Sequence, residues 1–280
     1  MEGAKKMGTL LKPKLMMTYV MLLLGIVMII PFLFMISFAL KTPLEMTQHP
    51  ASLLISHPFM GNFETIFKHK TYFIWYFNSI KVVLGVLVLR GLLVTMAAYA
   101  FARLEFRFKN VIFMILIAKM MIPSDTTIVA RFLLYKYLHL NNTHWAIILP
   151  AAFDVFFLFL LRQFFISIPK EISEAAIVDG CSHYKVYYRI ILPLAKPALV
   201  TMVLFTFLWT WNDFASPFVF ITDMKKQLLT VGLSYFQTEA GADYALQMAG
   251  AAVAVLPTIV LFIFAQKYFV QGVTMSGVKG

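Results

Sequence analysis

The sequence predicts an all-α, polytopic membrane protein with six transmembrane helices. Of its 280 residues, 61% are hydrophobic and 13% are charged, whereas soluble domains average roughly 45–50% apolar and ~25% charged residues. The hydrophobic residues are grouped in runs, and several runs reach the about 20 mostly apolar residues that a bilayer-spanning helix needs. Lys and Arg flank these runs, as membrane insertion favours.

The net charge of +11 does not indicate a nucleic-acid partner. No stretch interleaves Lys and Arg with exposed aromatic residues on a soluble scaffold, as single-stranded nucleic-acid binding requires. The single cysteine, Cys181, cannot form an internal disulfide and is by itself a poor metal site. We therefore expect membrane lipid as the surroundings of this chain, with no nucleic acid and no metal.

Six spans are expected along the chain, at 15–40, 78–102, 111–130, 145–165, 198–221 and 245–269. The first run ends in Ser37-Phe38-Ala39, which resembles a signal-peptide cleavage site. It is nevertheless much longer than the roughly 7–15 apolar residues of a signal sequence, so we expect a retained span. Residues 1–14 then form a short N-terminal segment, and residues 15–280 form one transmembrane domain.

The segments between the spans are mixed in character. A loop with room for short helices is expected over 41–76, which contains Pro43, Pro50 and Pro58, and other loops are expected over 131–144 and 222–244. With the N-terminus inside, the inner segments carry more Lys and Arg than the outer ones, which predicts that both termini are cytoplasmic. Arg90 and Lys119 fall inside spans, where ionisable groups are costly. Either each faces a bundle interior, a partner or water, or it extends to the interface from a differently placed span.

The inner segment 168–197 has a different pattern from the spans. Pro169 suits the start of a helix, and Glu171 and Glu174 lie near its positive N-terminal end. Gly180 can adopt a positive φ and end that helix. Ser182 can cap a second helix.

The second helix of this segment is expected to run to Leu192, where Pro193 and Pro197 limit its continuation. On the first helix, Ala175 and Ala176 form a low-relief face that another protein can approach closely, and the carboxylate of Glu174 suits a partner arginine. The alternative is an amphipathic helix that lies on the lipid surface.

This segment resembles the EAA loop of ABC importer permeases, through Glu174-Ala175-Ala176, Gly180 and Ile190-Ile191-Leu192-Pro193. The resemblance implies a type I ABC importer fold, with 15–280 as the permease domain and a cytoplasmic coupling-helix loop at 168–197. In that family, the loop seats in a cleft of the ATPase subunit and converts its closure into helix motion. The residues that would form this joint are Glu174, Ala175, Ala176, Asp179, Gly180, Leu192 and Pro193.

The resemblance covers nearly the whole chain and is closest to the carbohydrate-uptake group, the maltose-transporter-type second permease subunits. It rests further on Ala97-Ala98-Tyr99-Ala100-Phe101-Ala102-Arg103, Met121-Ile122-Pro123, Trp145-Ala146-Ile147-Ile148-Leu149-Pro150, Trp211-Asn212-Asp213-Phe214 and Tyr268-Phe269-Val270-Gln271-Gly272. Cys181 and Lys119 depart from the family's Ala and uncharged residue. The resemblance implies alternating-access import of a sugar across the cytoplasmic membrane of a prokaryote.

No Gly-Lys dipeptide occurs, so the chain contains no phosphate-binding P-loop. The resemblance implies that ATP and Mg are bound by two copies of a separate ATP-binding subunit. It also implies a second, different permease subunit and an extracytoplasmic solute-binding protein. This chain is then not an enzyme; it has no catalytic residue and carries no cofactor.

Polar and aromatic residues in the spans are candidates for the substrate path. The tryptophans can stack on sugar rings, although tryptophan is also common at membrane interfaces. The candidates are Asn78, Lys119, Asp154, Trp209, Trp211, Asn212 and Asp213.

Two alternatives stay open. A polyol or glycerol phosphate is another solute for the same machinery. An ion-coupled secondary transporter would need broken helices and carboxylates near mid-membrane, and only Asp154 and Asp213 meet the second condition.

Overall fold

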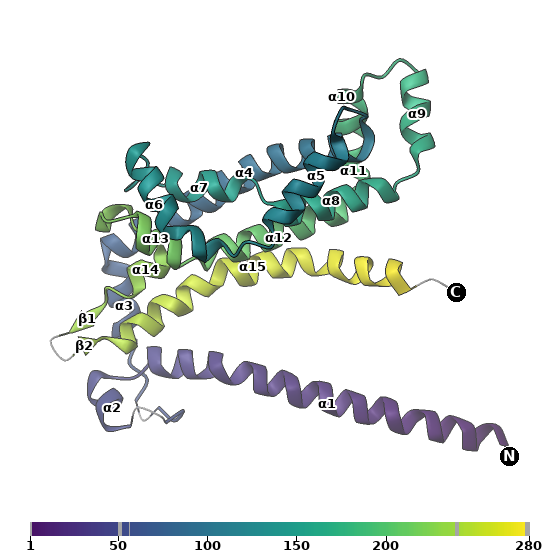
Figure 1. The fold of residues 1–280 in the computed structure, drawn as a ribbon. Helices are drawn as coiled ribbons and strands as arrows, with labels where there is room; N and C mark the ends of the chain where they lie inside the picture. Colours follow the sequence, from purple (N-terminus) through teal and green to yellow (C-terminus); the bar gives the residue numbers. More distant parts are fainter. Residues whose placement is uncertain (1, 50–51, 56, 239–240, 278–280) are drawn as a thin grey trace. The chain divides into compact units, whose positions relative to one another are not determined.

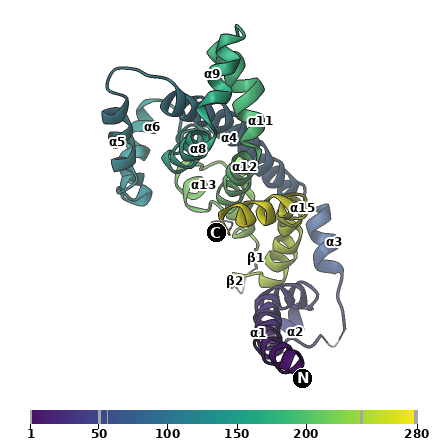
Figure 2. The same cartoon turned by 90° about the vertical axis from the view of Figure 1, so that its right-hand side faces the viewer.

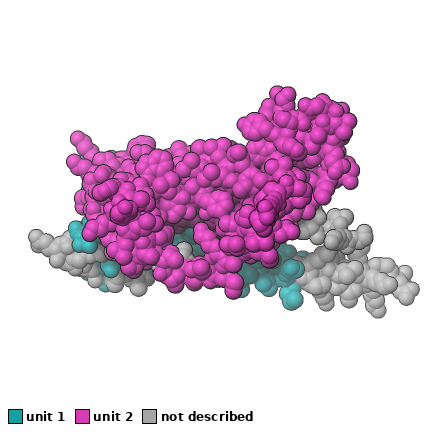
Figure 3. Space-filling view, turned by 45° about the horizontal axis from the view of Figure 1, so that its top comes forward, with its two compact units in different colours: residues 1–69, 234–253 teal, residues 70–233, 254–280 magenta. Residues whose placement is uncertain are grey.

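The computed structural model describes residues 2–49, 52–55, 57–238 and 241–277, and the chain divides into two compact units. Unit 1 comprises residues 1–69 and 234–253, and unit 2 comprises residues 70–233 and 254–280 (Figure 3). The described parts of both are helical, apart from one short antiparallel strand pair.

Unit 1 begins with the long helix α1. Its apolar stretch is almost uncovered, since only 6% of the most hydrophobic window is buried. Such a surface needs lipid or another protein around it, which agrees with a membrane span. The elements of unit 1 are α1 (Glu2–Ala39), α2 (Pro43–Gln48), α3 (Gly61–Lys68), β1 (Gln237–Thr238), β2 (Gly241–Ala242) and the first part of α15 (Tyr244–Gly277).

Polar side chains hold the end of α1. The ammonium of Lys41 is buried and donates to the carbonyls of His49 at 2.9 Å and Ser52 at 2.5 Å. The Asn62 amide donates to the carbonyls of Ala39 and Lys41, both at 2.9 Å. The Asn62 amide thereby satisfies carbonyls at the end of α1 that have no intrahelical partner. The expected loop over 41–76 contains the short helices α2 and α3, and its last residues belong to α4.

Unit 2 is built around helix α4 (Lys70–Arg103), which packs against α7, α8, α12 and α14. This helix starts eight residues before the expected second span, because the apolar and aromatic residues from Tyr72 to Tyr76 continue its buried face. The other elements in order are α5 (Lys109–Lys119), η1 (Ser124–Thr127), α6 (Ile128–Tyr137), α7 (Trp145–Ala152), α8 (Val155–Ser167), α9 (Lys170–Val178), α10 (His183–Val186), η2 (Tyr187–Ile191), α11 (Leu192–Leu194), α12 (Lys196–Trp211), α13 (Ala215–Phe220), η3 (Met224–Lys226), α14 (Leu229–Leu233) and the rest of α15 (Figure 1).

Four helical stretches among the described residues are long and apolar enough to cross a membrane: Leu15–Ala39, Lys70–Arg103, Trp145–Ser167 and Tyr244–Gln266. A fifth is the bent pair His183–Leu194 and Lys196–Trp211, whose axes meet at 78°. The expected span 111–130 is instead split between α5 and α6. Pro123 lies in the break, where its missing N–H and its ring oppose a continuous helix.

The close approach of α14 to α4 depends on Gly232. A Cβ atom at this position would lie 2.3 Å from the ring of Trp75. That ring is buried and donates its indole N–H to the carbonyl of Met224 at 2.7 Å, so it cannot move aside without losing a hydrogen bond.

We expect Gly232→Ala to destabilise the protein by about 1–3 kcal/mol, the usual range for overpacking a tight contact. Thermal unfolding of the detergent-solubilised protein measures this effect. Gly91→Ala on α4 is the control, because a Cβ atom there meets nothing within 4 Å, and alanine favours a helix. Equal melting temperatures for the two variants would contradict the expectation.

Candidate coupling site

Helix α9 stands beyond the end of α8, beside α10 and α11, at one end of unit 2 (Figures 1 and 2). Its start and end follow the signals in the sequence. Pro169 immediately precedes its first residue, and Gly180 follows its last turn with φ +85°.

Gly180 closes α9 in a Schellman motif. The N–H of Gly180 donates to the carbonyl of Ile177, and the N–H of Cys181 donates to that of Ala176, both at 2.9 Å. This pattern requires a left-handed residue directly after the helix, a conformation that glycine adopts at little cost. The expected end of the helix at Gly180 is confirmed.

The second helix of the segment begins where the sequence predicts. The Ser182 hydroxyl accepts a hydrogen bond from the Lys185 N–H at 3.4 Å and caps α10. The helix continues as the wider π turn η2, in which the Leu192 N–H donates to the carbonyl of Tyr187. This turn directly precedes Pro193, which has no N–H to continue a regular helix. The chain then bends by 78° into α12.

The two faces of α9 differ in burial. Ser173 and Ala176, three residues apart, are buried, and Ala176 belongs to the hydrophobic core formed with α4, α8, η2 and α12. Glu174, Ala175 and Val178 are exposed, and Val178 is 87% exposed. The outward face is therefore apolar at Ala175 and Val178, with more than one exposed carboxylate around it, and the inward face attaches the helix to the bundle.

The remaining residues assigned to the joint differ in burial. Asp179, Gly180 and Pro193 are exposed, whereas Leu192 is half-buried and packs against the core. The structure places Ala176 and Leu192 where they hold the segment onto the bundle.

Three contacts that sequence reasoning did not find tie this segment to α4. The Arg103 Nη2 atom donates to the carbonyl of Ile168 at 2.6 Å. The hydroxyls of Thr95 and Tyr187 lie 2.7 Å apart, and the rings of Tyr99 and Tyr187 are 5.3 Å apart between centroids. The signal in the sequence is that Tyr99 and Arg103 stand at the end of an expected span. Their position does not reveal which residues they contact.

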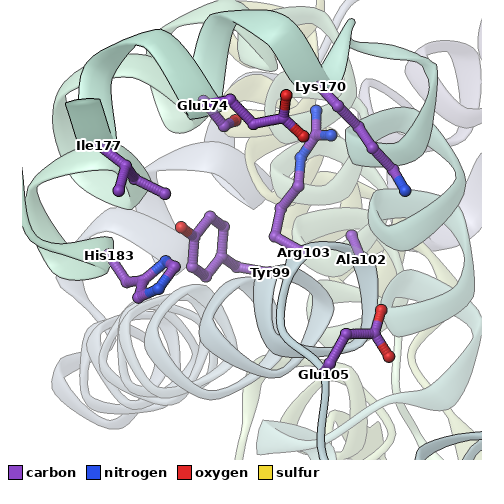
Figure 4. A pocket seen from close by; sticks show the side chains of 9 residues that line it. Tyr99, Ala102, Arg103, Glu105, Lys170, Glu174, Ile177 and His183 are labelled. Atoms are coloured by element: carbon purple, nitrogen blue, oxygen red, sulfur yellow. The ribbon is translucent and has the colours of Figure 1, made fainter.

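A cavity of about 240 Å³, lined by both charged and apolar side chains, lies between the end of α4 and the two helices α9 and α10. Figure 4 shows the side chains that surround it, among them a guanidinium from α4 and a carboxylate from α9. Its lining residues are Tyr99, Ala102, Arg103, Glu105, Lys170, Ser173, Glu174, Ile177 and His183.

Most of the substrate-path candidates hold the structure together. The Asn78 amide donates to the carbonyls of Lys225 and Gln227, both at 3.0 Å. Trp211 is buried, and its indole N–H donates to the carbonyl of Ala254 at 3.1 Å.

The next two candidates lie in the break after Trp211. Asn212 donates to the carbonyl of Leu208 at the end of α12, and the Asp213 carboxylate accepts from the N–H of Ser216 in α13. They shape this break in the helix.

Trp209 and Lys119 are the more exposed candidates. Trp209 is 48% exposed, and its ring packs on Phe156, Phe157 and Phe205. Lys119 is exposed at the end of α5. The contacts of the seven candidates fall into separate groups, and their role in a substrate path stays a prediction.

Asp154 takes part in a buried charge cluster with Arg90. The Arg90 side chain donates to the Ala151 carbonyl from Nε at 2.9 Å and from Nη2 at 2.6 Å, and to the Thr206 hydroxyl from Nη1 at 2.8 Å. Its Nη2 atom lies 3.5 Å from the Asp154 carboxylate, and the guanidinium lies over the ring of Phe157. Asp154 also caps α8 by accepting the N–H of Phe156 at 2.8 Å.

Arg90 thereby joins α4, α12 and the break between α7 and α8. Of the two readings of this residue, the structure supports the one in which it faces the bundle interior. Its presence in a span pointed to a buried partner, but the sequence did not say which.

These features define a polytopic helical membrane protein with a projecting helix pair, formed by α9 and α10. Residues 91–275 match the family described as "Binding-protein-dependent transport system inner membrane component". This chain belongs to that family, and it is an inner membrane protein and a permease subunit rather than an enzyme.

Curated relatives cover most of the chain. The arabinooligosaccharides transport system permease protein AraQ of Halalkalibacterium halodurans is 33% identical over 260 residues, which is 92% of this chain and 93% of AraQ. The maltodextrin transport system permease protein MdxG of Bacillus subtilis is 33% identical over 227 residues, 79% of this chain and 81% of MdxG.

A solved structure shows the same fold. A chain of a bacterial ABC transporter involved in the import of the acidic polysaccharide alginate has a TM-score of 0.81. It is 23% identical, and the match covers 91% of this chain and 97% of that chain.

Proposed function

We propose that this chain is a transmembrane subunit of an ATP-driven importer that translocates a sugar by alternating access. The observation that carries the proposal is helix α9: its small outward face holds Glu174 and Ala175, and its inward face is built into the core through Ser173 and Ala176. A helix that is exposed on one side and fixed on the other suits a joint between a partner and the bundle.

In this mechanism, the partner is a pair of ATP-binding subunits. Their closure on ATP moves α9, and α9 moves the elements packed against it. The core contacts of Ala176, Tyr187 and Ile191 reach α4, α8 and α12 without a flexible linker. Interiors packed in this way transmit displacement rather than absorb it. The 78° bend before α12 is the point at which such a displacement changes direction.

The assembly that we propose also contains a second, different permease and an extracytoplasmic solute-binding protein. Support for the binding protein comes from the description of the family as binding-protein-dependent. The uncovered apolar surface of α1 supports a further membrane partner or lipid at that helix. Both termini are proposed to be cytoplasmic, with six crossings if α5 to α6 and the bent pair each count as one.

The proposed solute is an oligosaccharide or a smaller sugar. The support is that the names of AraQ and MdxG specify arabinooligosaccharides and maltodextrin. The exposed ring face of Trp209 and the partly exposed Asp154 are the candidate contacts.

Co-purification from the native host tests the joint. We expect the tagged chain in mild detergent to bring an ATP-binding subunit and a second permease with it. Glu174→Lys is expected to reduce recovery of the ATP-binding subunit at least about tenfold, because it replaces a charge-assisted hydrogen bond with a repulsive charge. Glu64→Lys on α3 is the control, since Glu64 is also an exposed helical carboxylate.

Uptake into proteoliposomes then identifies the solute class. The purified complex, supplied with its binding protein, is tested with oligosaccharides, polyols and glycerol phosphate. ATP-dependent uptake of an oligosaccharide supports the proposal, and uptake of a polyol or glycerol phosphate alone would replace the sugar. Uptake by the isolated chain without ATP would show an ion-coupled secondary transporter.

A further inference from the structure

Arg103 is the last residue of α4 and lines the cavity between α4, α9 and α10. One guanidinium nitrogen, Nη2, donates to the carbonyl of Ile168, which caps the end of α8 two residues before α9 begins. The other two nitrogens, Nε and Nη1, are enclosed but have no hydrogen-bond partner among the described residues. A guanidinium presents five N–H donors in a fixed fork. Besides the bond to Ile168, this side chain therefore has N–H groups that can bind a further acceptor.

Ser173 on α9 is the second feature of the same cavity. Its side chain is buried, and its hydroxyl oxygen also has no hydrogen-bond partner among the described residues. Buried polar atoms are normally satisfied. Two residues that line one cavity, Arg103 on α4 and Ser173 on α9, therefore carry enclosed polar atoms without a partner among the described residues.

Glu174 is the acceptor on α9 that lines this cavity (Figure 4). It follows Ser173, and both Glu171 and Glu174 interact electrostatically with Arg103. In the present arrangement, its carboxylate is exposed and lies outside ion-pair distance of Arg103, because the ion pairs of the described residues do not include these two. The cavity of about 240 Å³ leaves room for α9 to approach α4.

We propose that Arg103 and Glu174 form a switchable ion pair, open in this arrangement and closed when α9 moves toward α4 during the transport cycle. On closure, Nε and Nη1 of Arg103 bind the Glu174 carboxylate, while Nη2 keeps the Ile168 carbonyl. Parallel N–H bonds to a carboxylate suit arginine in particular. Arg103 is thus a positioning residue that gives α9 two defined positions relative to α4.

The inference rests on the proposed function, because the movement of α9 is attributed to an ATP-binding partner. Its consequence is specific: Glu174 alternates between Arg103 and the partner. A ligand that prefers one of two arrangements shifts the equilibrium by its difference in affinity. The bound partner therefore opens the pair in the nucleotide state in which it contacts Glu174, and the pair closes in the state in which that contact is lost.

A cross-linking experiment on the intact complex tests this. Cysteines replace Ala102 on α4 and Ile177 on α9, which both line the cavity, in a Cys181→Ala background. The rate of disulfide formation with copper phenanthroline is compared between nucleotide-free and vanadate-trapped complexes. We expect at least a fivefold difference between the two states, which Arg103→Gln abolishes and the charge-retaining Arg103→Lys partly restores. Arg107→Gln is the matched control, because Arg107 is exposed four residues further along and lies over the ring of Phe108.

The outcomes separate the two proposals. Equal rates in both nucleotide states, or a difference that survives Arg103→Gln, overturn the ion pair even when the ATP-binding subunit still co-purifies. Absence of that subunit from the native complex overturns the proposed function instead. Glu174→Gln, measured in complexes that keep the partner, is expected to match Arg103→Gln, and the double variant is expected to add nothing further. An additive double variant also overturns the pair.

Discussion

Replacing Arg90 with methionine is expected to destabilise the protein by about 3 kcal/mol, near the lower end of the range for removing one partner of a buried ion pair. Arg90 is only 4% exposed, and its loss takes both donors from the Ala151 carbonyl and the donor from Thr206. It also leaves the Asp154 carboxylate without its ion pair. Asp154 is 27% exposed, and hydration of that part keeps the loss from being larger.

The measurement is the thermal unfolding of the purified complex in detergent. Arg90→Lys keeps the charge but not the fork of donors, so an intermediate loss is expected. Adding Asp154→Asn to Arg90→Met should recover part of the stability, because the neutral amide no longer leaves an unpaired charge. Lys119→Met is the control, since Lys119 is exposed. If Arg90→Met had the same melting temperature as this control, the cluster of Arg90 and Asp154 would not contribute to stability.

Replacing Gly180 with valine is expected to uncouple the projecting helix pair, with loss of most ATP-dependent transport. A β-branched residue is a genuine outlier at the observed φ of +85°. The strain is of order 1–3 kcal/mol, and the Schellman bonds to Ile177 and Ala176 are lost with the turn. The relation of α9 to α10 would then change, although the membrane helices would not.

A graded series makes this expectation sharp. Activity should fall from glycine through asparagine, which tolerates the left-handed region, to alanine and then valine. Binding-protein-stimulated ATP hydrolysis and solute uptake are measured on the same preparations. Gly25→Val in α1 is the control, because a Cβ atom there meets nothing within 4 Å. Equal uptake for Gly180→Val and Gly25→Val would show that the turn is not part of the coupling.

The projecting segment was the part of the candidate site most open to prediction. Pro169 and Gly180 act through their backbone conformation, and Ser182 acts through a hydroxyl that accepts a nearby backbone N–H. The structure places each where this local chemistry requires. The functional role of the residues around them is still a prediction, because it depends on a partner.

Helix continuity was less predictable from the pattern of apolar residues. A run such as 111–130 is apolar enough for a span, but the structure divides it into α5 and α6 around Pro123. The run at 198–221 is likewise interrupted after Trp211. Hydropathy reports the environment of a segment, whereas breaks depend on which neighbour supplies the missing hydrogen bonds.

The sequence by itself determined the membrane class, the positions of the main apolar helices and the two ends of α9. These properties follow from composition, run length and local backbone preference. Only the tertiary structure decided that Arg90 joins Asp154 and Thr206, that Arg103 binds the carbonyl of Ile168, and that Trp211 is buried. Such contacts link residues more than 40 positions apart. A polar residue in an apolar run shows that a partner is needed, but packing alone chooses which residue that partner is.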